Sequence, residues 1–315
     1  MEKVRTENVT VVKHTGSHYW VSPLPLWKPV CCVIRGKIRT KELYTTNPIA
    51  VGDLVDYQPQ TGENAEGYGV ITKIHPRKNY IIRKSVNLSR QAHIIAANID
   101  TAFLVFTLAF PETMTAFADR FLVTCEAYRV PAVIILNKID LMGSYREETE
   151  IFKEIYRGAG YPVIETSAIT GEGIEGLREL CRGKLSLISG ISGTGKSSLI
   201  NSLDPSLNLR TGDISDYHLQ GKHTTTFYEI HPVKSGGYII DTPGIRGFGL
   251  IEMADQELSH YFPEMLRVLD GCRFSPCTHT HEPGCAVKEA LDRGEISPER
   301  YSSYLGMLQE ETKYR

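Results

Sequence analysis

Long hydrophobic runs are missing from this sequence. No stretch of 18 or more apolar residues occurs among its 315 residues, so nothing predicts a membrane-spanning helix. Residues 1–7 lack the apolar core of a signal peptide. The sequence also has no internal repeat and no low-complexity segment. We therefore expect a globular, cytoplasmic protein without a membrane partner.

Neither sign of charge dominates, because the formal net charge is only −2. The distribution is uneven: residues 1–90 contain 14 Lys and Arg against 7 Asp and Glu, whereas the remainder contains 21 against 30. A small basic module on an acidic body suggests that one end contacts a polyanion. The alternative is a solvated basic face without a partner.

Short apolar segments separated by turn residues fill residues 1–85 and predict an all-β domain. About five strands over this length suit a small OB-like barrel, and such barrels bind nucleic acid through a basic face. Four basic residues at period two would share one strand face: Arg35, Lys37, Arg39 and Lys41. The alternative role of these charges is to protect an edge strand from aggregation.

Residues 86–250 change to alternating strands and helices and predict a parallel α/β domain. Near-continuous apolar segments at 101–108 and 132–136 are typical of strands buried on both faces. Five short polar motifs each follow such a strand. Because open α/β sheets bind ligands at the carboxyl ends of their strands, we expect the motifs to meet in one site.

One of these motifs, between a predicted strand at 185–189 and a helix at 196–203, has the pattern of a phosphate loop. Its glycines allow backbone N–H groups to surround phosphate oxygens, and Lys196 is expected to reach the β- and γ-phosphates. Ser197 is expected to bind Mg²⁺. The predicted nucleotide-binding set is Gly190, Ile191, Ser192, Gly193, Thr194, Gly195, Lys196, Ser197 and Ser198.

Two motifs are expected to recognise the base of the nucleotide. The first consists of Asn137, Lys138 and Asp140, and the second, with Ser167 and Ala168, follows one βαβ step later. A carboxylate at Asp140 accepts two hydrogen bonds from guanine, whereas adenine would leave it unpaired. Taken alone, this motif also fits a helix N-cap after a strand. Together, the two motifs favour GTP over ATP.

Asp241 and Gly244 supply the predicted nucleotide switch, and one of Thr224, Thr225 and Thr226 is expected to close over Mg²⁺. We select Thr225. The water-orienting Gln that follows such a glycine in Ras-type enzymes is replaced by Ile245. His223 is the nearest candidate to orient water, and a solvent-facing loop histidine is the alternative.

The order of these motifs along the chain differs from that of an ordinary Ras-like GTPase. The two base motifs precede the phosphate loop instead of following the switch. A circular permutation preserves a binding site, because the site depends on spatial arrangement and not on chain order. It also leads the second switch directly into residues 251–315, which we expect to form a mostly α-helical domain.

Three cysteines and a histidine gather within 14 residues of that C-terminal domain: Cys272, Cys277, His279 and Cys285. In a cytoplasmic chain such a cluster indicates metal rather than disulfides. Three thiolates and an imidazole are a common structural zinc set, which leaves no position for a substrate. His281 is an alternative fourth ligand, and unliganded buried thiols are the alternative to a metal site.

In combination, these features resemble the ribosome small-subunit-dependent GTPase A family. The likeness rests on the permuted order, the barrel, residues 221–226 and the cysteine cluster. It implies a GTPase that acts late in maturation of the small ribosomal subunit, which stimulates hydrolysis. It also implies that the barrel and the zinc domain contact ribosomal RNA and protein. Lys222 stands where the family would more often have Arg.

We expect a monomer that binds GTP or GDP, Mg²⁺ and one structural Zn²⁺, with no DNA partner. Two other functions compete with this reading. A metabolic phosphotransferase would use the phosphate loop on a small acceptor, and a constitutive RNA-binding scaffold would bind nucleotide only for stability.

Overall fold

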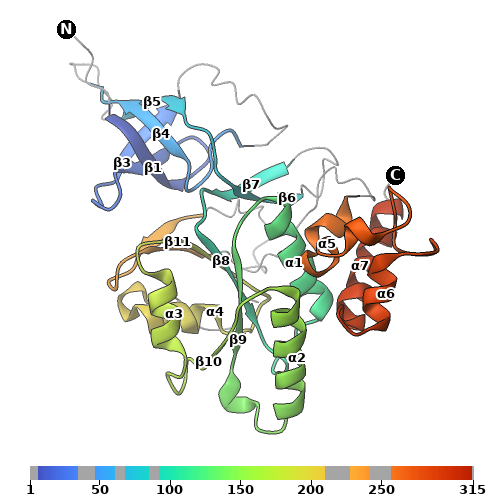
Figure 1. Ribbon diagram of the computed structural model, residues 1–315. Coiled ribbons are helices and arrows are strands. Elements are labelled where there is room, and N and C mark those ends of the chain that lie inside the picture. The colour runs from blue at the N-terminus through green and yellow to red at the C-terminus, as the bar shows by residue number, and fades with distance from the viewer. Residues whose placement is uncertain are drawn as a thin grey trace.

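The computed structural model describes residues 6–34, 47–60, 68–84, 92–209, 228–241 and 257–313. It consists of a β-barrel, a central sheet with helices on both faces, and a C-terminal helical group that packs beside the first helix (Figure 1). The predicted basic residues at 35–41 lie outside the described residues, as do the switch residues at 222–226 and 242–245.

The N-terminal barrel closes in the order β1-β2-β3-β5-β4. Its parallel pair is β3 with β5, and its other pairs are antiparallel. Alternate apolar side chains fill the interior because successive residues of a strand point to opposite faces. The OB-like barrel predicted from the sequence is confirmed. Its strands are β1 (Thr6–His14), β2 (Tyr19–Ser22), β3 (Val30–Ile34), β4 (Leu54–Gln58) and β5 (Gly69–Ile74).

A two-stranded antiparallel sheet of β6 (Tyr80–Lys84) and β7 (Ala92–Ala97) follows the barrel. Gly52 lies at the junction with φ of +87°, and a Cβ there would lie 2.0 Å from the carbonyl oxygen of Ala97. Only glycine avoids that clash. The barrel also touches the edge of the central sheet, where Lys13 forms an ion pair with Glu229 at 2.8 Å.

The central sheet has the order β10-β9-β8-β11-β13-β12. All neighbours are parallel except the edge strand β12, which runs antiparallel to β13. The carboxyl ends of the parallel strands therefore share one edge. The strands are β8 (Thr101–Phe106), β9 (Ala132–Asn137), β10 (Val163–Thr166), β11 (Leu185–Ser189), β12 (Ile230–Pro232) and β13 (Tyr238–Asp241).

Helices cover both faces of this sheet. Alternate residues of β8 separate two cores: Leu104 packs with α1 (Thr115–Ala127) and α2 (Arg146–Ala159), whereas Phe103 packs with α3 (Ile174–Cys181) and α4 (Lys196–Leu203). Because both faces are buried, the strands are apolar throughout, as their sequences predict. Two short 3₁₀ turns, η1 (Ile139–Leu141) and η2 (Pro205–Leu207), follow β9 and α4.

The C-terminal group is mostly helical, as predicted. It consists of η4 (Leu258–Tyr261), α5 (Pro263–Leu266), η5 (Leu269–Gly271), α6 (Ala286–Asp292) and α7 (Pro298–Lys313). Helix α7 packs along α1, and its Arg300 joins Asp119 of α1 to Glu264 of α5. These three charged side chains are at most 4% exposed.

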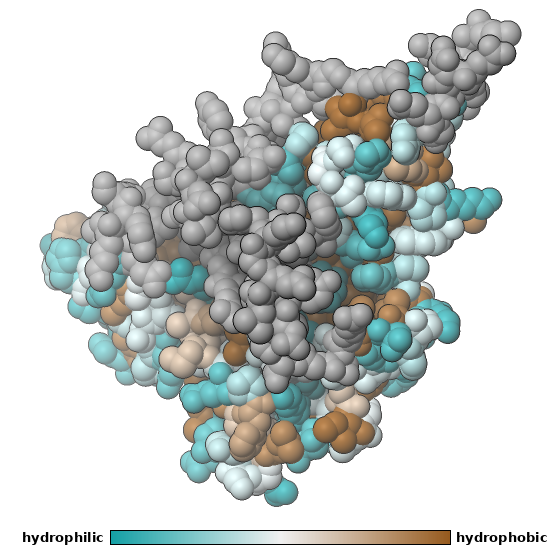
Figure 2. Space-filling view, turned by 180° about the vertical axis from the view of Figure 1, so that it is seen from behind, coloured by the Kyte–Doolittle hydropathy of each residue, from teal (hydrophilic) through white to brown (hydrophobic). Residues whose placement is uncertain are grey.

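Each helix in the described part of the chain is too short or too polar to span a bilayer. Figure 2 shows the face opposite to that of Figure 1, where hydrophobic residues of the described part form small separate groups among hydrophilic ones.

Candidate functional site

The phosphate-loop sequence joins β11 to α4 at the shared edge of strand ends. Gly190 lies so close to β8 that a Cβ would come within 2.5 Å of the carbonyl oxygen of Val105. Gly193 and Gly195 have φ of +84° and +92°, which glycine adopts without a steric penalty. The loop therefore wraps tightly before α4 begins at Lys196, so the positive end of that helix faces the loop.

Lys196 lies inside this loop. Its ammonium group donates to the carbonyl oxygens of Gly190 and Ile191, at 2.8 and 2.7 Å. Burial lowers the pKa of Lys196, and the negative charge of Asp241 opposes that effect. Ser197 and Ser198 follow in the first turn of α4, half-buried.

Asp241 ends β13, which lies next to β11 and is separated from β9, the strand that ends at Asn137, by β8 and β11. Burial raises the pKa of its carboxyl group, and Lys196 and His231 oppose that effect. Among the residues that the structure describes, its buried Oδ1 has no hydrogen-bond partner. Carboxylate and hydroxyl oxygens are the ligands that Mg²⁺ prefers, so the buried oxygen of Asp241 beside the start of α4 fits a magnesium ion.

Asn137 connects the base motifs to the phosphate loop. Its amide nitrogen donates to the carbonyl oxygen of Thr194, 57 residues away, at 2.7 Å. Its amide oxygen accepts from the hydroxyl of Thr166 at 2.9 Å. The side chain is 1% exposed. Both ends of the amide therefore bond to protein, so Asn137 joins the ends of β9 and β10 to the phosphate loop.

Lys138 and Asp140 make two further connections at this edge. The ammonium group of Lys138 donates to the carbonyl oxygen of Gly193 at 2.7 Å and to that of Phe110. The hydroxyl of Ser167 donates to Asp140 at 2.5 Å and accepts from the backbone N–H of Thr170 at 3.1 Å. The residues predicted to recognise guanine are thus held together by protein contacts.

Ala168 follows Ser167 at the start of this loop and is half-buried. The turn closes at Gly173, where φ is +72° and a Cβ would lie 1.9 Å from the carbonyl oxygen of Glu165. The predicted site residues His223, Thr225 and Gly244 lie outside the described residues.

Sequence reasoning missed one segment of this site, the loop at 107–113 after β8. Phe110 accepts a hydrogen bond from Lys138, and the ring of Pro111 lies against Gly193. No motif marks this loop. The dipeptide of Phe110 and Pro111 indicates a turn only in general terms.

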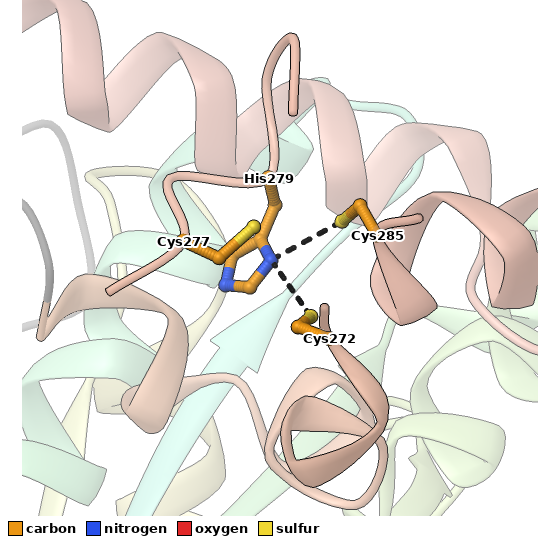
Figure 3. Close-up of side chains that lie close together, drawn as sticks. All are labelled: Cys272, Cys277, His279 and Cys285. Atoms are coloured by element: carbon orange, nitrogen blue, oxygen red, sulfur yellow. Dashed lines mark hydrogen bonds between the residues drawn. The ribbon is translucent and has the colours of Figure 1, made fainter. Parts of the chain in front are cut away.

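The four residues of the predicted metal set converge, as Figure 3 shows. One ligand atom from each lies within 4.8 Å of the others. Nδ1 of His279 is 3.4 Å from Sγ of Cys285 and 3.7 Å from Sγ of Cys272. Ligands on a tetrahedral zinc, with Zn–N about 2.0 Å and Zn–S about 2.3 Å, lie roughly 3.6 Å apart. The spacing therefore fits zinc.

The surroundings of the cluster also suit a structural metal. Burial raises the pKa of Cys277 to about 12, so its thiolate requires a compensating cation. Tyr301 donates to the carbonyl oxygen of His279 at 2.5 Å, and His279 has φ of +58°. The alternative ligand, His281, is exposed and is not part of the four-residue group.

A phosphate loop at the centre of a parallel sheet, with base motifs on strands that precede it in the chain, defines a circularly permuted P-loop nucleotide-binding protein. The family model described as RsgA GTPase matches residues 74–251. The chain belongs to the RsgA GTPase family, as its likeness to the ribosome small-subunit-dependent GTPase A family predicted.

Curated relatives that carry the name small ribosomal subunit biogenesis GTPase RsgA match this chain over nearly its whole length. The protein from Bacteroides fragilis is 50% identical over 311 residues, which cover 97% of this chain and 98% of the relative. The protein from Porphyromonas gingivalis is 50% identical over 312 residues and 97% of each chain.

Two solved structures share the whole fold. The crystal structure of YjeQ from Thermotoga maritima superposes with a TM-score of 0.77 at 36% identity, covering 98% of each chain. The crystal structure of YloQ, described as a circularly permuted GTPase, has a TM-score of 0.74 at 29% identity, covering 99% of this chain and 96% of YloQ. The fold class predicted from the sequence is confirmed.

Proposed function

We propose that the protein binds and hydrolyses GTP as a maturation factor of the small ribosomal subunit, and that the subunit stimulates hydrolysis. The observation that carries this proposal is the hydrogen bond from Asn137 to Thr194. It joins the guanine motif to the phosphate loop, so one nucleotide can contact both. The names of the relatives support the ribosomal role.

Guanine recognition is assigned to Asp140, which Ser167 holds in place through its hydroxyl. Lys138 presents its side chain along the same edge, because its ammonium group is held at Gly193. A base without the N1–H and the amine of guanine would leave Asp140 without the two hydrogen bonds that guanine offers, which disfavours ATP.

Phosphate binding is assigned to residues 190–198, with Lys196 on the β- and γ-phosphates. A magnesium ion would be held by Ser197 and Thr225, with Asp241 acting through water. Mg²⁺ supplies neutralisation of the charge on the phosphates. Gly244 would bond the γ-phosphate, and His223 would orient the attacking water because Ile245 replaces the usual Gln.

The three parts receive separate roles. We assign residues 1–85 to a barrel that binds ribosomal RNA, 86–250 to the GTPase domain, and 251–315 to a zinc domain that also contacts the subunit. A closed zinc site of four protein ligands stabilises a segment with little core of its own. The factor would act as a monomer without a DNA partner.

Hydrolysis of GTP with and without purified small subunits tests the proposal. The expected result is a low basal rate of GTP hydrolysis that small subunits raise by at least about tenfold. Large subunits should not raise this rate, and small subunits should not stimulate hydrolysis of ATP. The variant Lys196→Ala serves as a control because it removes the phosphate-binding ammonium group. Rapid turnover that requires a small-molecule acceptor would instead indicate a phosphotransferase, and no turnover would indicate a scaffold.

A further inference from the structure

The loop at 107–113 is held rigidly beside the nucleotide site. The hydroxyl of Thr107 donates to the carbonyl oxygen of Pro111 at 2.6 Å, and the N–H of Thr113 donates to the carbonyl oxygen of Thr107 at 3.0 Å. Lys138 holds the tip through the carbonyl oxygen of Phe110. These bonds leave the tip of the loop with little freedom to move.

This loop presents an aromatic side chain to solvent at a conformational cost. Phe110 has φ of +58°, a value that bulky residues rarely adopt, and its side chain is 60% exposed. Its ring meets that of Tyr145 edge-on, with centroids 6.4 Å apart and planes at 86°. Neither the strain nor the exposure is explained by packing in the core, which points to use at the surface.

Beside the two rings lies a hollow of about 370 Å³, which is within the size range of ligand-binding clefts. It is lined by Leu108, Ala109, Phe110, Glu112, Tyr145 and Glu148. Within the part of the chain that the structure describes, neither Glu112 nor Glu148 forms an ion pair. The described lining of the hollow therefore combines aromatic and aliphatic walls with two carboxylates and no cationic side chain.

We propose that this hollow is a docking site for an arginine side chain on a basic segment of a protein partner. A guanidinium group is planar and stacks on aromatic rings, and it forms charge-assisted hydrogen bonds with carboxylates. The lining supplies both kinds of contact within one cavity. RNA is disfavoured as the occupant because Glu112 and Glu148 repel phosphates. The site goes beyond the proposed GTPase function and does not depend on it.

Fluorescence anisotropy with a fluorescein-labelled hexa-arginine peptide tests the site on the full zinc-bound chain. The double variant with Glu112→Gln and Glu148→Gln is expected to weaken binding by about tenfold, because it removes both charged contacts. The variant Phe110→Ala is expected to weaken it by several-fold through loss of the aromatic contact. A hexa-lysine peptide is expected to bind less tightly than hexa-arginine.

The matched control is the double variant with Glu147→Gln and Glu154→Gln, which makes the same charge change outside the hollow on α2. It is expected to change the affinity less than twofold. Equal losses in both double variants would reduce the interaction to general charge attraction and overturn the proposal. Undetectable peptide binding would also overturn it, as would tight binding of labelled hexauridylate that depends on Phe110. All of the altered side chains are exposed, so unchanged melting curves identify the effects as local.

Discussion

Replacing Arg300 tests the junction between the C-terminal group and the GTPase domain. This side chain is 1% exposed and joins two carboxylates from different elements. Its Nη1 lies 2.7 Å from Oδ1 of Asp119, and its Nε lies 2.6 Å from Oε1 of Glu264. The guanidinium carbon also lies 4.7 Å from the ring centroid of Phe262. The variant Arg300→Met keeps most of the volume but removes the charge.

The expected loss follows from the two carboxylates that would remain buried. Burial already raises the pKa of Asp119, and Arg300 opposes that effect. Without the guanidinium group, both acids must be protonated or hydrated at neutral pH. Removal of one partner from a buried ionic group costs about 3–5 kcal/mol. At about 2 °C per kcal/mol for a large domain, the melting temperature should fall by roughly 6–10 °C.

Differential scanning calorimetry of the protein prepared with added zinc measures this change. The matched control is Arg293→Met, because Arg293 forms an exposed pair with Glu295 and its loss should leave melting unchanged. The triple variant with Asp119→Leu, Glu264→Leu and Arg300→Met should recover most of the loss, because it leaves no buried charge. The reasoning fails if Arg300→Met melts like the control, or if the triple variant melts no higher than the single one.

Three other changes test separate parts of the molecule. Asp140→Asn should lower GTP affinity at least about 100-fold and favour xanthosine triphosphate in equilibrium titrations, and unchanged selectivity would remove base recognition from this residue. Metal analysis should find about one zinc per chain, and Cys277→Ser should lower that content, whereas a metal-free but fully folded C-terminal group would refute the site. Burial raises the pKa of Asp204, but hydrogen bonds from Ser206 and Lys234 outweigh that effect, so the pKa is lowered overall. The stabilising effect of Asp204 should therefore be complete above about pH 4 and fade at lower pH. Urea unfolding of Asp204→Asn should show a stability gap to the unaltered protein that narrows on acidification, and a constant gap would contradict the assignment.

The sequence predicted those features whose residues lie close together along the chain. The phosphate loop and the zinc set each lie within a short segment, so residue type and spacing identify them. The strand ends could be placed because their apolar runs stop at polar motifs. Strand boundaries were harder to predict: β4 begins only at Leu54, since Gly52 turns the chain at positive φ.

Contacts between distant segments were not predictable from the sequence. Arg300 and Asp119 are 181 residues apart, and nothing in either neighbourhood marks them as partners. The loop that presents Phe110 can likewise be recognised as part of the site only from its contacts with Lys138 and Gly193. Such contacts depend on how the helices and loops pack in three dimensions, which periodicity and motif spacing do not specify.

The permuted strand order has a consequence for synthesis of the chain. Strands β8, β9 and β10 pair side by side and precede β11, which inserts beside β8 to carry the phosphate loop. In a nascent chain, the strands that carry the proposed base motifs are therefore synthesised before the phosphate loop. A polypeptide released before residue 197 thus contains the residues proposed to select the base but not the complete phosphate loop.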